Sequence, residues 1–173
     1  MALHIIIDGY NLIRQSSDLS ALDDIDLQAG REALIDLLAA YKKLKPHRIT
    51  VVFDGANAPP ASERRSNAKG IEIRFSGQGE LADQLINRMV RKAGQKALVV
   101  SSDREVAHFA LGHGAAAVPS PEFANRLAMA SQIGRPILEG EENGGWTPTT
   151  KKKGPSRRLP KKARRLRAKT AKL

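Results

Sequence analysis

Near its start the chain reads Leu3-His4-Ile5-Ile6-Ile7-Asp8-Gly9-Tyr10-Asn11. Three consecutive β-branched residues, with no polar residue between them, are typical of a short strand buried on both faces, as in the middle of a parallel sheet. Asp8 comes where this strand is expected to end. Open α/β sheets place their sites at the carboxyl ends of the strands, so Asp8 is a first candidate for a functional residue.

The same pattern of an apolar run followed by an aspartate occurs twice more, at residues 49–55 with Asp54 and at residues 97–103 with Asp103. Each aspartate alone has a structural explanation, either as part of an Asp-Gly turn or as a residue favoured at a helix amino terminus. Parallel strands, however, end at one edge of a sheet. We therefore expect Asp8, Asp54 and Asp103 to converge there.

The segments between the strands indicate an α/β fold with a mostly parallel sheet. Apolar residues recur at helical spacing over residues 27–44, and Pro46 ends this helix. Strand, helix and strand of these lengths form a crossover unit, which implies parallel strands. Residues 14–24 and 55–70 have the composition of loops. We also expect helices at 80–93, 102–111 and 120–132, and strands at 96–101, 115–118 and 71–75, the last near a sheet edge.

A fourth carboxylate, Asp83, lies at the border of the apolar face of the helix expected at 80–93. Alone it is explained as an exposed aspartate near the positive end of the helix dipole, but from this position it can lean over the strand ends. Four clustered carboxylates repel one another unless a cation neutralises them. Oxygen ligands without His or Cys suit Mg²⁺ or Mn²⁺, and such a site can activate water for attack on a phosphodiester.

Two polar residues near the aspartates are weaker candidates. Asn11 follows Asp8 by three residues, so its amide could orient a water or a phosphate, or could cap the turn. Arg104 stands beside Asp103 and could pair with that carboxylate or with a phosphate. We regard both as supporting residues.

Composition excludes several classes of protein. There is no cysteine among the 173 residues, which removes disulfides, thiolate zinc sites and cysteine nucleophiles. No apolar run is long enough to span a membrane, and the start of the chain does not resemble a secretory signal. We therefore expect a cytoplasmic protein that does not bind membranes.

The net charge of +11 belongs to the last part of the chain. Twelve Lys or Arg and no acid follow Thr147, which leaves 17 bases and 18 acids in residues 1–146. We expect a folded domain at 1–134, followed by a flexible linker and basic tail at 135–173 that binds nucleic acid through its phosphates. The candidate nucleic-acid-binding residues are Arg64, Arg65 and Lys69 in the loop, where a plain surface excursion is an equal alternative, and Lys151, Lys152, Lys153, Arg157, Arg158, Lys161, Lys162, Arg164 and Arg165 in the tail.

Four segments resemble, in order, the motifs of the NYN domain in its YacP-like branch, within the PIN-like nucleases: Ile7-Asp8-Gly9-Tyr10-Asn11, Val52-Phe53-Asp54, Glu80-Leu81-Ala82-Asp83 and Ser101-Ser102-Asp103-Arg104. The resemblance spans about residues 3–130. It implies a Rossmann-like (PIN-like) three-layer α/β/α sandwich with a mostly parallel central sheet, and a metal-dependent ribonuclease. It also implies that Asp8, Asp54, Asp83 and Asp103 bind Mg²⁺ or Mn²⁺, with Glu80 and Asn11 in support.

Two other functions remain open. The first is a dinucleotide-binding oxidoreductase, because Gly77-x-Gly79-x-x-Ala82 follows a strand and opens a helix. Glu80 and Asp83 speak against it, since they place negative charge where a pyrophosphate would bind. The second is a non-catalytic RNA-binding or ribosome-associated module, whose acidic cluster is only structural.

Overall fold

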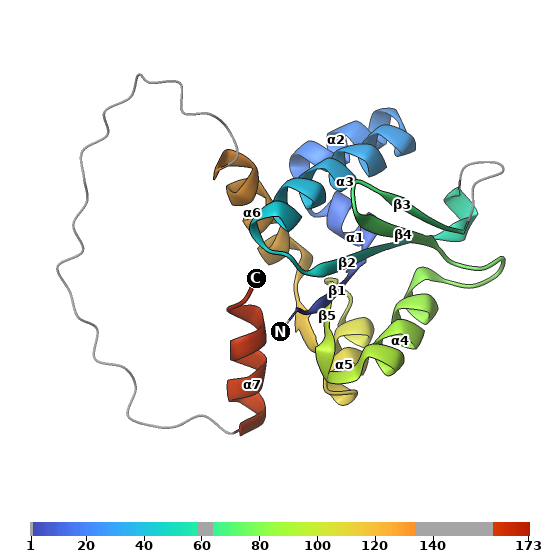
Figure 1. Cartoon of the computed structure of the whole chain (residues 1–173). Helices are drawn as coiled ribbons and strands as arrows, with labels where there is room; N and C mark the ends of the chain where they lie inside the picture. The colour runs from blue at the N-terminus through green and yellow to red at the C-terminus, as the bar shows by residue number, and fades with distance from the viewer. Residues whose placement is uncertain (1, 59–63, 134–160) are drawn as a thin grey trace, which may run out of the picture.

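A six-stranded sheet forms the centre of the molecule, in a computed structural model that describes residues 2–58, 64–133 and 161–173 (Figure 1). The strand order is β3-β4-β2-β1-β5-β6, and every neighbouring pair is parallel except β3 with β4. The expected mostly parallel sheet is therefore confirmed. The strands are β1 (His4–Asp8), β2 (Arg48–Phe53), β3 (Arg65–Ala68), β4 (Ile71–Phe75), β5 (Ala97–Val100) and β6 (Ala116–Val118).

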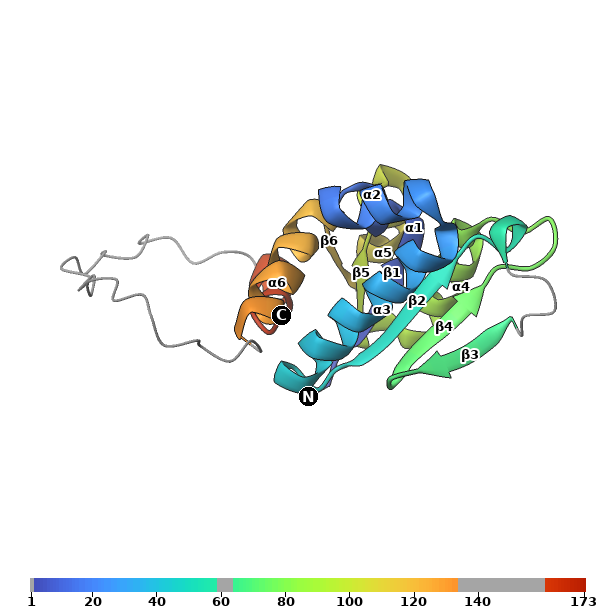
Figure 2. The same ribbon diagram turned by 90° about the horizontal axis from the view of Figure 1, so that it is seen from above.

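Helices cover both faces of the sheet, which gives the expected three-layer sandwich (Figure 2). Ile5 and Ile7 of β1 belong to one buried apolar cluster and Ile6 belongs to the other, so the central strand is buried on both sides. This is the arrangement that its unbroken β-branched run predicts. The first layer has α1 (Gly9–Arg14), α2 (Ser17–Ile25), α3 (Leu27–Leu44) and α6 (Ser120–Ile133); the second has α4 (Ala82–Ala93) and α5 (Arg104–Gly112).

The register of the sheet brings the ends of the three central strands level. Asp8 pairs with Val52 of β2, and Ile7 pairs with Val100 of β5. Asp8 is the last residue of β1, and Asp54 directly follows β2. The fold therefore supplies the common edge that the sequence pattern requires.

The expected loop at 14–24 is wrong, because most of this segment belongs to α1 and α2. Asp8 accepts a hydrogen bond from the Asn11 N–H at 3.3 Å and so caps α1. The helix α2 packs on α3 and buries Leu19. Its sequence is mostly polar because only this narrow side is covered.

The expected loop at 55–70 is wrong in its second half, where β3 forms an antiparallel hairpin with β4. The turn of this hairpin uses Lys69 and Gly70, both with positive φ, as primed hairpin turns require. β4 is therefore the second strand of the sheet, near its edge as expected, and β3 forms the edge itself. Glu72 of β4 is buried, where the alternating pattern predicts exposure, and it forms ion pairs with Arg48, Arg65 and Arg74.

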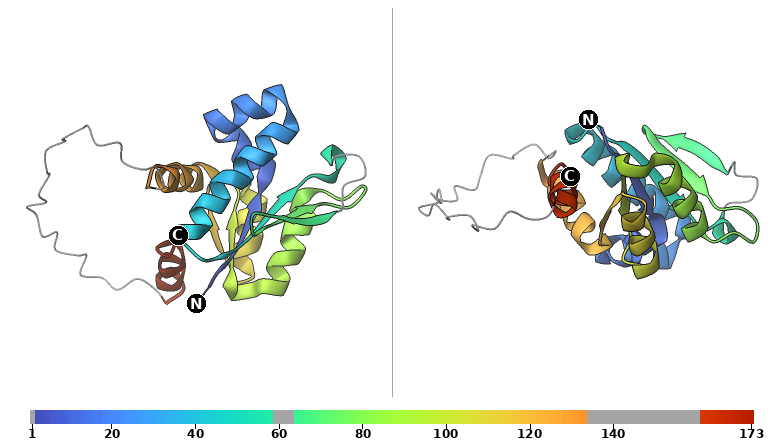
Figure 3. Two further views of the ribbon diagram at one scale, coloured as in Figure 1. Left: turned by 45° about the horizontal axis from the view of Figure 1, so that its top comes forward. Right: turned by 90° about the horizontal axis from the view of Figure 1, so that it is seen from below.

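The last thirteen residues also differ from the expected flexible tail. They include a helix, α7 (Lys161–Thr170), and the chain end packs against the core beside β6 (Figure 3). Leu173 is only 6% exposed, and its carbonyl accepts a hydrogen bond from the Tyr41 hydroxyl at 2.7 Å. Five of the expected tail contacts lie outside the described residues: Lys151, Lys152, Lys153, Arg157 and Arg158. Among the helices that the structure describes, none is long and apolar enough to cross a membrane.

Candidate active site

Four aspartates gather at the carboxyl edge of the sheet. Burial, followed by the negative charges of Asp83 and Asp103, raises the pKa of Asp8 from 3.8 to about 6, although hydrogen bonds to the carboxylate act in the opposite direction. The pKa of Asp83 is also raised, first by burial and then by Asp103, Glu105 and Asp54. Asp83 is thus close enough to Asp8, Asp54 and Asp103 for electrostatic interaction with each of them. They form one acidic site, to which Glu105 adds a charge that the sequence analysis did not include.

Ser101 joins two of these aspartates. Its hydroxyl donates a hydrogen bond to Oδ2 of Asp8 at 3.2 Å and accepts one from the Asp103 N–H at 3.1 Å. The side chain is 4% exposed, so the bridge is shielded from water. Sequence analysis did not select Ser101 as a site residue. The available signal was a small hydroxyl residue directly after a buried strand, next to an expected site residue.

Local structure fixes the carboxylates of Asp54 and Asp103 through one oxygen each. Oδ1 of Asp54 accepts the Ala56 N–H at 2.9 Å, and Oδ1 of Asp103 accepts the N–H groups of Glu105 and Val106 at 2.7 and 3.2 Å. Asp103 therefore caps α5, which begins at Arg104 and not at residue 102 as expected. The second carboxylate oxygen, Oδ2, of Asp54 and of Asp103 accepts no hydrogen bond from the described residues. The same holds, among those residues, for both oxygens of the Asp83 carboxylate.

The Asn11 side chain joins the segment after β1 to the segments that precede α5 and begin α6. Its Oδ1 accepts hydrogen bonds from the Ser102 N–H at 2.9 Å and from the Ser120 hydroxyl at 2.7 Å. Ser120 in turn donates its N–H to the Ser102 hydroxyl at 3.2 Å. Because the amide oxygen is occupied in this way, Asn11 positions the amino ends of α5 and α6 relative to β1. A contact with a water or phosphate is left to its amide NH₂ group.

The other supporting candidates lie apart from the aspartates or make no contact with them. Glu80 accepts the Gly77 N–H at 2.9 Å and pairs with Arg88 at 2.6 Å, and these contacts lower the pKa of Glu80. Its own carboxylate thus occupies the glycine loop where the oxidoreductase hypothesis requires a pyrophosphate. Arg104 is exposed on the first turn of α5, with no ion pair to a described residue.

The expected nucleic-acid contacts of the loop are engaged in contacts within the fold. Arg65 pairs with Glu72 at 3.0 Å, Lys69 pairs with Asp36, and Arg64 donates to the carbonyl of Ser76. In the tail, Arg165 is exposed and, together with Lys169, lines a cleft beside α7. Three further tail candidates belong to α7: Lys161, Lys162 and Arg164.

The chemistry of the acidic site suits a hard divalent cation, although no three of its groups are preassembled as ligands. Within the described ranges, no three His, Cys, Asp or Glu side chains lie close enough together to bind a metal directly. Among the same residues, no ion pair with Lys or Arg neutralises Asp8, Asp54, Asp83 or Asp103. Mg²⁺ commonly keeps several waters and binds through one or two carboxylates plus substrate phosphates. The uncompensated carboxylates fit a cation held in that manner.

Comparison with known proteins agrees with this fold. A protein of Bacillus subtilis (strain 168), named uncharacterized protein YacP, is 29% identical over 87 residues, which are 50% of this chain and 51% of that protein. The chain thus spans about half the length of the curated relative that it matches. A crystal structure of Rae1 (YacP) from B. subtilis has a TM-score of 0.62 and 25% identity, covering 77% of each chain. A mutant of the same protein has a TM-score of 0.62 and 23% identity, covering 76% of this chain and 78% of that one.

The family match extends further along the chain than these individual comparisons. The YacP-like NYN domain matches residues 5–167, from β1 into α7. It therefore continues well beyond residue 130, where the motif resemblance in the sequence ends. With this coverage and the PIN-like fold of the described residues, the chain belongs to the family of YacP-like NYN domains.

Proposed function

We propose that this protein is an endoribonuclease that hydrolyses RNA phosphodiesters with the help of Mg²⁺ or Mn²⁺. Membership of the NYN family, within the PIN-like nuclease superfamily, supports ribonuclease activity in general. The observation that carries the finer proposal is the gathering of Asp8, Asp54, Asp83 and Asp103 at one edge with no cationic partner among the described residues. Such a site attracts a divalent cation because nothing else neutralises it.

The aspartates contribute from three directions in this proposal. Asp8 and Asp103, joined by Ser101, present carboxylate oxygens from two strand ends, and Asp83 presents its carboxylate from the first turn of α4. Asp54 adds negative charge beside Asp83. A bound divalent cation would polarise the phosphodiester and lower the pKa of a nearby water.

Asp8 gives the proposed activity a defined pH dependence. Its carboxyl has a pKa of about 6, so it is mostly protonated, and a poor cation ligand, below that pH. Cleavage should therefore rise as the pH passes through about 6 and level off above it. A bound cation would shift this rise in cleavage rate to lower pH, because a positive charge favours the charged form of the Asp8 carboxyl.

The test is cleavage of an end-labelled single-stranded RNA by the purified protein with Mg²⁺, with Mn²⁺ or with EDTA. Wild type should cut only with a metal. Asp8→Asn and Asp103→Asn should lose at least about a hundredfold in rate. Asp18→Asn, at an exposed position of α2, is the matched control and should cleave normally.

The contrary result has a clear meaning. RNA binding without metal-dependent cleavage, in wild type and in every variant, would favour the non-catalytic RNA-binding or ribosome-associated module. The caps formed by Asp8, Asp54 and Asp103 are compatible with that second function, since each carboxylate also has a structural contact.

A further inference from the structure

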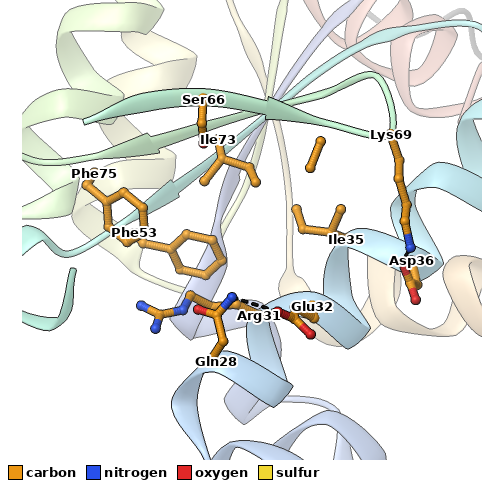
Figure 4. A pocket seen from close by; sticks show the side chains of 11 residues that line it. Gln28, Arg31, Glu32, Ile35, Asp36, Phe53, Ser66, Lys69, Ile73 and Phe75 are labelled. Carbon is orange, nitrogen blue, oxygen red and sulfur yellow. Dashed lines mark hydrogen bonds and ion pairs between the residues drawn. The ribbon is translucent and has the colours of Figure 1, made fainter. Parts of the chain in front are cut away.

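A pocket of about 560 Å³ lies between α3 and the β3–β4 hairpin, on the sheet face opposite α4 (Figure 4). This volume is in the range of small-molecule sites. Its walls are mainly apolar, and its rim is polar, with Gln28, Glu32 and Ser66. The side chains that form the walls include Ile35, Phe53, Ile73 and Phe75.

Arg31 is the unusual residue of this pocket. It lines the pocket but is only 7% exposed, and no carboxylate of the described residues forms an ion pair with it. Asp23 acts on it only through a longer-range charge interaction. One terminal nitrogen donates to the Tyr10 hydroxyl at 3.1 Å and to the Asn57 carbonyl at 2.7 Å, yet the buried Nε has no hydrogen-bond partner in the described chain.

An unsatisfied buried donor of this kind is costly, by about 1–3 kcal/mol in typical proteins. A ligand that offers an acceptor to Nε would remove this cost. The guanidinium also lies over the ring of Phe75, at 5.7 Å from its centre, so a flat ligand would meet an arginine and aromatic side chains together. Figure 4 shows the Arg31 side chain extending along the pocket towards Phe53 and Phe75.

The pocket adjoins the acidic site. Phe53, in its wall, immediately precedes Asp54. Asn57, which accepts from Arg31, ends the short 3-10 helix that Asp54 caps, and Tyr10 follows Asp8 by two residues. The pocket and the acidic site are thus connected through residues next to Asp8 and Asp54 in the chain, so one RNA strand could contact both.

We propose that the pocket binds an unstacked nucleobase of an RNA strand, whose edge accepts a hydrogen bond from Arg31 Nε–H. The inference rests on the proposed function, because RNA supplies the base. Unpaired bases are commonly recognised by aromatic side chains and arginine planes together with hydrogen bonds to their edges. A phosphate suits the pocket less well, because Lys69 is paired with Asp36 and the carboxylate of Glu32 stands at the rim.

Ser66 allows the pocket to be blocked without disturbing the core. It is an exposed residue of β3 that lines the mouth, and neighbouring residues of a strand point to opposite faces. Ser66→Trp should therefore fill the opening. Asn67→Trp adds the same side chain one position further along β3, outside the pocket lining, and is the matched control. Arg31→Gln removes the Nε–H donor that is proposed to bind the base inside the pocket.

The experiment is a titration of the full chain, in EDTA, with AMP, GMP, CMP and UMP, followed by backbone amide NMR. At least one nucleotide should shift amides of α3 and of the β3–β4 hairpin saturably, while ribose 5-phosphate, which lacks a base, should not. Ser66→Trp and Arg31→Gln should weaken this binding by about tenfold or more. Asn67→Trp and Asp8→Asn should bind as wild type does.

Three results would overturn the inference: no saturable shift with any nucleotide, equal binding of ribose 5-phosphate, or unchanged binding by Ser66→Trp. The cleavage assay is read separately. Metal-dependent cleavage without base binding would refute the proposed binding of a base in the pocket, and the proposed function would remain. Base binding without any cleavage would refute the endonuclease and retain the pocket.

Discussion

Asp8 is the residue at which stability and function oppose each other most directly. Burial is the main cause that disfavours the charged form of Asp8 in the folded state. It raises the pKa of Asp8 to about 6, from an ordinary value of 3.8. Between these pH values the folded protein binds more protons than the unfolded chain. The free energy of unfolding therefore falls as the pH rises through this window, and it stays lowered above it.

Replacing Asp8 by Asn should remove this pH-dependent loss. In metal-free buffer at about pH 7.5, Asp8→Asn should be more stable than wild type by about 1–2 kcal/mol, after allowance for partial solvent exposure. The difference should shrink as the pH falls to 3.8 and should vanish well below it, where Asp8 is protonated in both the folded and the unfolded protein. Urea unfolding at several pH values measures it, and Asp18→Asn serves as the control. A variant that is less stable than wild type at neutral pH would contradict this account of Asp8.

Divalent cations should reverse the order of stability. If the proposed site binds Mg²⁺ in the folded state, excess Mg²⁺ should raise the free energy of unfolding of the wild type. Asp8→Asn should gain much less from the same addition. Thermal unfolding with and without Mg²⁺ tests cation binding independently of any cleavage, and an equal gain in both proteins would argue against a cation at Asp8.

Ser101 should tune Asp8 rather than take part in chemistry itself. Its hydroxyl lowers the pKa of Asp8 by donating to the carboxylate, and it also holds the Asp103 N–H. Ser101→Ala should move the acidic limb of the pH–rate profile to higher pH, by about half a unit to one unit, and should lower turnover. Ser131→Ala, which removes a hydroxyl bonded within α6, is the control. An unmoved limb would show that the bridge is only structural.

At the scale of single elements, the packing of α7 and the chain end on the core is the clearest feature that the sequence did not predict. Leu173 is buried, and Leu166 packs against the same apolar cluster. Burial also raises the pKa of Tyr41 to about 12, so its hydroxyl remains a donor to the Leu173 carbonyl throughout the neutral range. Truncations that remove residues 161–173 therefore take away core contacts as well as positive charge.

Leu173→Ala should lower the free energy of unfolding by about 1–3 kcal/mol, since most of a buried leucine side chain is lost. Arg167→Ala, at an exposed position of the same helix, should change it by less than about 0.5 kcal/mol. Urea unfolding curves of both variants give the comparison. If the two variants unfold alike, the chain end does not pack on the domain in solution.

At the scale of the whole molecule, charge is unevenly distributed along the chain. The twelve bases after Thr147 account for the net charge of +11, while residues 1–146 are close to neutral. Of these bases, the five between Lys151 and Arg158 precede α7, so they can be replaced without altering the residues that pack on the core. This separates the electrostatic part of RNA binding from the stability of the fold.

Replacement of those five bases by glutamine should flatten the dependence of RNA affinity on salt. Each phosphate contact to a single strand contributes about 0.7 to the slope of log K against log salt, so the slope should fall by up to about 3.5. Turnover at saturating RNA should stay unchanged. Lys43→Gln with Lys45→Gln, on the near-neutral domain, is the control and should alter the slope less. A loss of turnover at saturation would place these bases in the chemistry instead.

Local pattern alone was enough for the parallel strands of the sheet and for the placement of Asp8, Asp54 and Asp103 at or just after their carboxyl ends. Unbroken β-branched runs specify strands buried on both faces, and parallel strands must end at one edge, so the acids after β1, β2 and β5 converge by topology. The helix at 27–44 was predicted with its observed bounds for the same kind of reason, because its apolar spacing repeats over five turns.

What the sequence could not determine depends on partners distant along the chain. Ser101 bridges to Asp8 across 93 positions, and Asn11 bonds Ser120 across 109, so no window of sequence contains both members of either pair. The helix α2, the strand β3 and the docking of α7 rest on narrow apolar contacts or on pairing with a neighbouring element, so their sequences are mostly polar. The sequence by itself determined that three aspartates lie at or just after the ends of neighbouring strands. Only the tertiary structure decided which other acidic groups, such as Glu105, lie near them and how hydrogen bonds orient them, because those contacts exist only after the chain has packed.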